Sequence, residues 1–151
     1  MFFPYITLKQ GGFARTTHRT GGRTRFPPLR HVTDFKRSSI TKMNEIVKNE
    51  LDRIINTLVE TGIVTRIILF GSYARGEETP DSDLDLCVIT PVENRHPIDI
   101  TVDFRARLYG VKTMPLDLIT CNEDNFSYRA AYAGTLEHEV AEYGVTVYEH
   151  K

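Results

Sequence analysis

The fold is decided by residues 69–86, which read LFGSYARGEETPDSDLDL. The apolar run of residues 63–70 ends at Gly71-Ser72, which is typical of a buried strand that turns directly into a helix. A helix start presents free backbone N–H groups to an anion, a glycine lets a phosphate approach the backbone, and the Ser72 hydroxyl adds a donor. The stretch therefore predicts a strand, a phosphate cradle at Gly71 and Ser72, and a short helix.

Two carboxylates follow the cradle after a polar loop. Asp83 and Asp85 lie two residues apart on an expected strand at residues 83–89, so both side chains project from one face of the sheet. Such a pair repels itself unless a cation lies between the carboxylates, and Mg²⁺ binds one or two carboxylates together with phosphate oxygens. A carboxylate pair beside a phosphate cradle indicates metal-assisted phosphoryl chemistry.

Apolar periodicity on both sides of this stretch predicts alternating helices and strands. A helix is expected from about Met43 to Gly62, because apolar side chains from Val47 to Leu58 share one helical face. Further strands are expected at residues 115–120 and 145–148, and further helices within 122–133 and at 135–143. This alternation predicts the α/β fold class.

Residues 97–109 are ambiguous between strand and helix. Their apolar residues alternate, which favours a strand. The spacing of Ile98 and Val102 after Pro97 permits a helix instead. A helix is the better hypothesis, because it provides a crossover before the next strand.

Charge is divided unevenly along the 151-residue chain. Residues 1–42 carry nine Lys or Arg and one acid, a net charge of +8, whereas residues 43–151 carry ten Lys or Arg and nineteen acids, a net charge of −9. We therefore expect one folded domain at 43–151, preceded by a basic, flexible extension at 1–42. Three interpretations of that extension stay open: a solvated tail, sequence upstream of a native start at Met43, or an arm for nucleic acid or targeting.

The cysteines and the hydropathy pattern point to an ordinary intracellular protein. Cys87 and Cys121 lie in apolar runs and are expected to be buried, reduced thiols rather than a disulfide framework. No run of 18 apolar residues is present, so no transmembrane helix is expected. A cytoplasmic location without a membrane partner is the resulting hypothesis.

Gly71-Ser72, ten residues and then Asp83-x-Asp85 resemble the GS-x₁₀-DxD signature of the DNA polymerase β-like nucleotidyltransferase superfamily. The flanking residues 74–76, Ala-Arg-Gly, are similar to those of its smallest members, the minimal nucleotidyltransferases. That family has a third carboxylate on a neighbouring strand, and Asp117 matches it. The resemblance covers residues 43–151, which it identifies as a nucleotidyltransferase domain.

The resemblance implies a fold and an activity. The fold would be a small mixed β-sheet of about four strands with helices packed behind it. The activity would be transfer of a nucleoside monophosphate, with AMP from ATP as the leading case, to an acceptor hydroxyl. Asp83, Asp85 and Asp117 would be the catalytic residues and would hold two Mg²⁺ ions.

The resemblance also implies a nucleotide-binding set. Gly71, Ser72 and Arg75 would bind the phosphates of the nucleotide triphosphate, because Arg75 lies one turn into the short helix and can neutralise phosphate charge. Arg75 has a second interpretation, as half of a surface ion pair with Glu77 or Glu78.

The acceptor is the part of the expected reaction that the sequence constrains least. Minimal members of the superfamily commonly act as antitoxins that transfer AMP to a HEPN-type toxin, so the resemblance implies a protein partner of this kind. Three alternatives stay open: nucleotidyl transfer to a small molecule such as an aminoglycoside, a non-catalytic antitoxin that only binds its partner, and modification of nucleic-acid ends with the help of the basic extension. Nucleic acid is not favoured as a partner, because aromatic residues do not interleave regularly with the basic ones.

Overall fold

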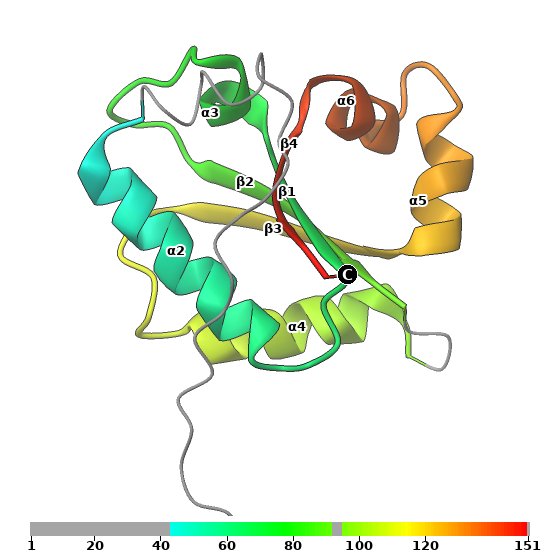
Figure 1. The fold of residues 1–151 in the computed structure, drawn as a ribbon, viewed down its shortest axis with the longest axis horizontal. Helices are drawn as coiled ribbons and strands as arrows, with labels where there is room; N and C mark the ends of the chain where they lie inside the picture. Colours follow the sequence, from blue (N-terminus) through cyan, green and yellow to red (C-terminus); the bar gives the residue numbers. More distant parts are fainter. Residues whose placement is uncertain (1–42, 92–94, 151) are drawn as a thin grey trace, which may run out of the picture.

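The computed structural model describes residues 43–91 and 95–150, in which helices and strands alternate (Figure 1). In chain order the elements are α2 (Glu45–Val59), β1 (Arg66–Phe70), α3 (Gly71–Arg75), β2 (Leu84–Thr90), α4 (Pro97–Leu108), β3 (Leu116–Asn122), α5 (Glu123–Ala130), α6 (Leu136–Tyr143) and β4 (Val145–Glu149). None of the described helices has the length and apolarity needed to cross a membrane. The basic extension expected at 1–42 lies outside the described residues.

Within the described residues, four strands form one mixed sheet in the order β3-β2-β1-β4. β1 runs antiparallel to both β2 and β4, whereas β2 and β3 are parallel. A parallel pair needs a crossover connection, and α4 provides it between β2 and β3. The predicted combination of helices with a small, mixed, four-stranded sheet is confirmed.

Helices cover both faces of this sheet (Figure 1). α2 and α4 pack on one face, where the larger core includes Leu58, Leu86 and Phe104, each at most 1% exposed. α5 and α6 pack on the other face, where Phe126 and Val140 contribute to a smaller core. The helices α2 and α4 match the expectation of helices packed behind the sheet. The helices α5 and α6 form a second layer on the opposite face.

α2 is an amphipathic helix with one buried stripe. The apolar residues of that stripe are Leu51, Ile54, Ile55 and Leu58. Burying each of these side chains stabilises the fold by about 1.5–3 kcal/mol. The Asn44 side chain caps the first turn by accepting a hydrogen bond of 2.9 Å from the Ile46 N–H.

α4 confirms the helix prediction for residues 97–109 but presents a different face to the core. Ile100, Phe104 and Leu108 are each 1% exposed and lie one helical turn apart. Ile98 and Val102, whose spacing suggested the helix, are 65% and 61% exposed. The alternating pattern places apolar residues on both sides of a helix, so periodicity did not indicate which side is buried.

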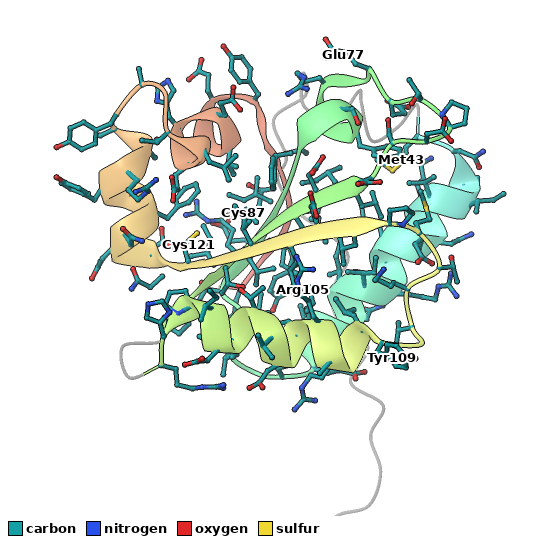
Figure 2. All side chains as sticks on the ribbon, turned by 180° about the vertical axis from the view of Figure 1, so that it is seen from behind. Met43, Glu77, Cys87, Arg105, Tyr109 and Cys121 are labelled. Atoms are coloured by element: carbon teal, nitrogen blue, oxygen red, sulfur yellow. The ribbon has the colours of Figure 1, made fainter. Side chains whose placement is uncertain are left out.

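The two cysteines are free, buried thiols on neighbouring strands (Figure 2). The Sγ atoms of Cys87 and Cys121 lie 3.5 Å apart between the sheet and the α5–α6 layer. The hydrogen bond to Cys121, together with burial, raises the pKa of the Cys87 thiol. The expectation of buried, reduced thiols is confirmed.

Candidate active site

The strand register brings together two of the three carboxylates singled out in the sequence. Asp85 on β2 lies directly opposite Asp117 on the parallel strand β3. Neighbouring strands are about 4.8 Å apart, and opposite residues point to the same face, so the two carboxylates are neighbours. On its other side Asp85 pairs with Phe70, the last residue of β1. The end of β1 and the starts of β2 and β3 therefore meet at Asp85.

Asp83 reaches this cluster from a turn rather than from a strand. β2 begins at Leu84, so the expected strand at 83–89 starts one residue too early. The preceding turn is closed by reciprocal hydrogen bonds, from Thr79 N to Ser82 Oγ at 2.8 Å and from Ser82 N to Thr79 O at 3.0 Å. This turn delivers Asp83 as an exposed carboxylate two residues before Asp85.

Asp85 is a half-buried carboxylate with two other negative charges near it. Its pKa is raised above the ordinary value, first by burial and then by the negative charges of Asp117 and Asp83, while Arg75 opposes the shift. Asp85 is half-buried, whereas Asp117 and Asp83 are exposed. The cluster is therefore a site where a cation would relieve a repulsion that Arg75 compensates only in part.

Gly71 is packed directly against Asp85. Its φ of 68° lies in the left-handed region, which favours glycine. A Cβ at this position would overlap Asp85 Oδ2 and lie 2.8 Å from Asp85 Cγ. Glycine at position 71 therefore leaves the carboxylate room at the turn between β1 and α3.

Ser72 and Arg75 lie on α3, which follows this turn. Ser72 is half-buried in the first turn of the helix, beside the glycine. Arg75 is 45% exposed and forms an ion pair of 2.9 Å with Glu77, which lies at the outer edge of the molecule in Figure 2. The surface ion pair considered for Arg75 is thus present, and the Arg75 charge also acts on Asp85.

The site fits a divalent cation that is shared with a phosphate-bearing ligand. In the described part of the chain, no three His, Cys, Asp or Glu side chains already stand in an arrangement that holds a metal ion. Mg²⁺ does not need such a cage, because it is usually bound by one or two carboxylates, phosphate oxygens and water. Asp85 with Asp117 or Asp83 provides the protein's share of such a ligand set.

The sequence did not single out Glu50, a buried carboxylate that contacts the loop before Asp117. Glu50 on α2 is fully buried, and its carboxylate accepts hydrogen bonds from the loop that leads into β3. The signal was present in the helical spacing, because Glu50 lies three residues after Val47 and four before Ile54, on the apolar stripe of α2. A charged residue within an apolar stripe is a reason to look for a buried partner.

Comparisons with known proteins give a matching family and a similar curated protein. The sequence model of a family described as "Nucleotidyltransferase domain" matches residues 49–139, a span that contains every residue of the site. A protein of Methanocaldococcus jannaschii named "Putative protein adenylyltransferase" is 37% identical over 71 residues, which cover 46% of this chain and 68% of that protein.

A solved structure is also similar to this chain. It is a "putative nucleotidyltransferase" from Sulfolobus solfataricus, with a TM-score of 0.47 and 15% identity over 72% of this chain and 90% of that one.

Proposed function

Because this chain belongs to the nucleotidyltransferase domain family, within the DNA polymerase β-like superfamily, we propose that it transfers AMP from ATP to a hydroxyl group of a partner protein. The reaction would require Mg²⁺ at Asp83, Asp85 and Asp117. The single observation that best supports this proposal is the pairing of Asp85 with Asp117, with Gly71 packed against the same carboxylate.

Each group of the site has a role in the transfer. Mg²⁺, when bound, would supply the positive charge that lowers the pKa of the acceptor hydroxyl and stabilises the leaving pyrophosphate. Asp117 takes the hydroxyl proton while the acceptor oxygen bonds to the α-phosphorus and the bond from that phosphorus to the β-phosphate oxygen breaks. Gly71 and Ser72 hold the outer phosphates, and Arg75 exchanges its partner Glu77 for a phosphate oxygen.

A protein acceptor is supported by the similar protein from Methanocaldococcus jannaschii, whose name is "Putative protein adenylyltransferase". We propose a HEPN-type toxin as this acceptor, by analogy with the minimal nucleotidyltransferases that the motif resembles. The protein would then act as an antitoxin that inactivates its partner by covalent modification.

The test is an intact-mass measurement. The full chain is mixed with ATP, Mg²⁺ and the product of the gene adjacent to its own, and the mass of that product is followed. We expect a gain of one or more AMP units that is lost when EDTA replaces Mg²⁺. Asp85→Asn should abolish the gain, whereas Asp99→Asn, which removes an exposed acid from α4, should leave it unchanged.

Each other outcome contradicts part of the proposal. A tight complex without a gain in mass would indicate an antitoxin that acts by binding alone. If no complex forms and the mass does not change, the protein acceptor is overturned. The search for the acceptor would then turn to small molecules such as aminoglycosides, or to nucleic-acid ends. A gain that persists in EDTA would refute the role of Mg²⁺.

A further inference from the structure

Glu50 is a fully buried carboxylate with no place in the chemistry described so far. It lies on α2, in the stripe that otherwise buries Leu51, Ile54 and Leu58. An apolar residue would serve packing at this position as well or better, because removing a charge from water is costly and a well-packed apolar replacement for a buried ion pair is often neutral or stabilising. The presence of Glu50 therefore calls for a reason other than packing.

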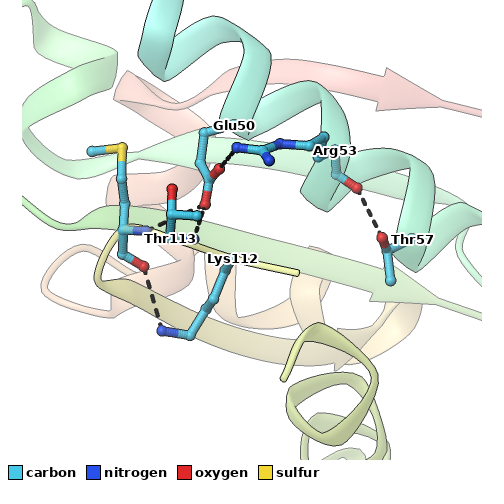
Figure 3. Close-up of polar contacts among 6 residues, drawn as sticks. Glu50, Arg53, Thr57, Lys112 and Thr113 are labelled. Atoms are coloured by element: carbon cyan, nitrogen blue, oxygen red, sulfur yellow. Dashed lines mark hydrogen bonds and ion pairs between the residues drawn. The ribbon is translucent and has the colours of Figure 1, made fainter. Parts of the chain in front are cut away.

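The Glu50 carboxylate holds the loop that leads into β3 (Figure 3). Its Oε1 accepts hydrogen bonds from the backbone N–H of Thr113 and, at 3.3 Å, from that of Met114. Its Oε2 pairs with the guanidinium of Arg53, one turn along α2. Burial alone would raise the pKa of Glu50, but the hydrogen bonds from Thr113 and Met114 and the charge of Arg53 together lower it below its ordinary value.

The same loop is joined to the start of β2. Pro115, which follows Met114, accepts a hydrogen bond of 3.0 Å from the backbone N–H of Leu84. Leu84 separates Asp83 from Asp85 in the sequence, and Asp117 follows Pro115 by two residues. The Glu50 carboxylate is thus hydrogen-bonded to Thr113 and Met114, and the adjoining Pro115 is hydrogen-bonded to Leu84. Through this short loop Glu50 is connected to the backbone segments that carry all three acidic residues of the site.

We propose that Glu50 is a positioning residue, which fixes residues 113–115 against α2 and thereby holds Asp117 in register with Asp85. The inference rests on the proposed role of the three carboxylates in binding Mg²⁺ and in catalysis. Among the strands of residues 43–91 and 95–150, β3 lies at the edge of the sheet and pairs with β2 alone. Its start therefore has one neighbouring strand to restrain it, and Glu50 supplies a second restraint from α2.

The main variant is Glu50→Leu, which keeps the approximate side-chain size and leaves the Thr113 and Met114 N–H groups without their acceptor. Glu50→Gln is the conservative variant, because its amide oxygen can still accept from the loop. Leu58→Ala on the same helix is the stability control, since it opens a cavity at a fully buried residue that has no hydrogen bond to the loop. All are assayed at a temperature where circular dichroism shows them folded.

Two readouts separate positioning from stability. One is kcat for AMP transfer, and the other is binding of Mn²⁺ alone, followed by the loss of its free-ion electron paramagnetic resonance signal. We expect Glu50→Leu to lower kcat by about 100-fold, as for an active-site displacement on the order of 1 Å, and to weaken Mn²⁺ binding by roughly tenfold. Glu50→Gln should recover most of both, and Leu58→Ala should retain both despite its lower Tm.

The proposal is overturned if Leu58→Ala loses as much kcat as Glu50→Leu at equal stability, or if Glu50→Leu binds Mn²⁺ like the unmodified protein. Should Glu50→Leu fail to fold, Glu50→Asp carries the same test, because it withdraws the carboxylate from the loop by one methylene. Asp85→Asn is measured alongside. If Asp85→Asn also keeps full Mn²⁺ binding, the proposed metal site fails; if it loses binding while Glu50→Leu keeps it, the positioning role alone fails.

Discussion

Replacing Gly71 with alanine should remove most of the activity at a modest loss of stability. An alanine Cβ at position 71 would overlap Asp85 Oδ2 and lie 2.8 Å from Asp85 Cγ, whereas ordinary van der Waals contact begins at 3.4 Å. Asp85 Cγ must therefore retreat by at least about 0.6 Å, and Oδ2 by more. A displacement on the order of 1 Å in an active site lowers the rate by about 100-fold, so we expect kcat to fall by that factor.

The stability cost of the same substitution comes from the backbone. Gly71 has a φ of 68°, and an L-residue in this left-handed region costs about 1–2 kcal/mol. For a domain of this size that corresponds to a fall in Tm of roughly 4–16 °C. Gly62→Ala is the matched control, because Gly62 has a φ of 75° and a Cβ there meets nothing within 4 Å.

The two variants are compared by steady-state kcat and KM for ATP and by thermal unfolding. Gly62→Ala should lose similar stability and keep its kcat, whereas Gly71→Ala should lose both. If the kcat of Gly71→Ala for AMP transfer lay within about threefold of the kcat of Gly62→Ala, the close packing of Gly71 on Asp85 would not matter for catalysis. That result would refute the reasoning.

Two further predictions concern the charges around Asp85. Burial and the carboxylates of Asp117 and Asp83 raise the pKa of Asp85, so its ionised form destabilises the fold above that raised pKa, and the cost disappears as the pH falls through it. Without Mg²⁺, the Tm of Asp85→Asn at pH 7 should therefore be about 2–4 °C higher than that of the unmodified protein, and the difference should vanish towards pH 4. Added Mg²⁺ should raise the Tm of the unmodified protein but not that of the variant. An unchanged Tm of Asp85→Asn at pH 7 would contradict this prediction. Arg75→Ala should raise the KM for ATP by about tenfold through loss of one charge-assisted contact, whereas Glu77→Gln, which releases Arg75, should leave KM equal or lower. If neither substitution changed the KM for ATP, the ion pair between Arg75 and Glu77 would be only a surface contact.

The structure also shows which parts of the site depend on residues far apart in the chain. Asp117 was singled out by its match to a motif, but its position beside Asp85 follows from the pairing of β2 with β3 across the α4 crossover. Glu50 was overlooked because its partner Thr113 lies 63 residues further along the chain. No local pattern reports such a contact.

The sequence by itself determined the elements and the motif. Strand and helix tendencies, turn residues and the Gly-Ser and Asp-x-Asp spacing act over a few neighbouring positions, so the strand into Gly71 and the acids after it were predicted close to their observed places. The tertiary structure alone decided the strand order β3-β2-β1-β4, the inward face of α4 and the hydrogen bonds of Glu50 to the β3 loop. These features depend on which distant surfaces bury one another, and a chain fixes that only when its elements pack.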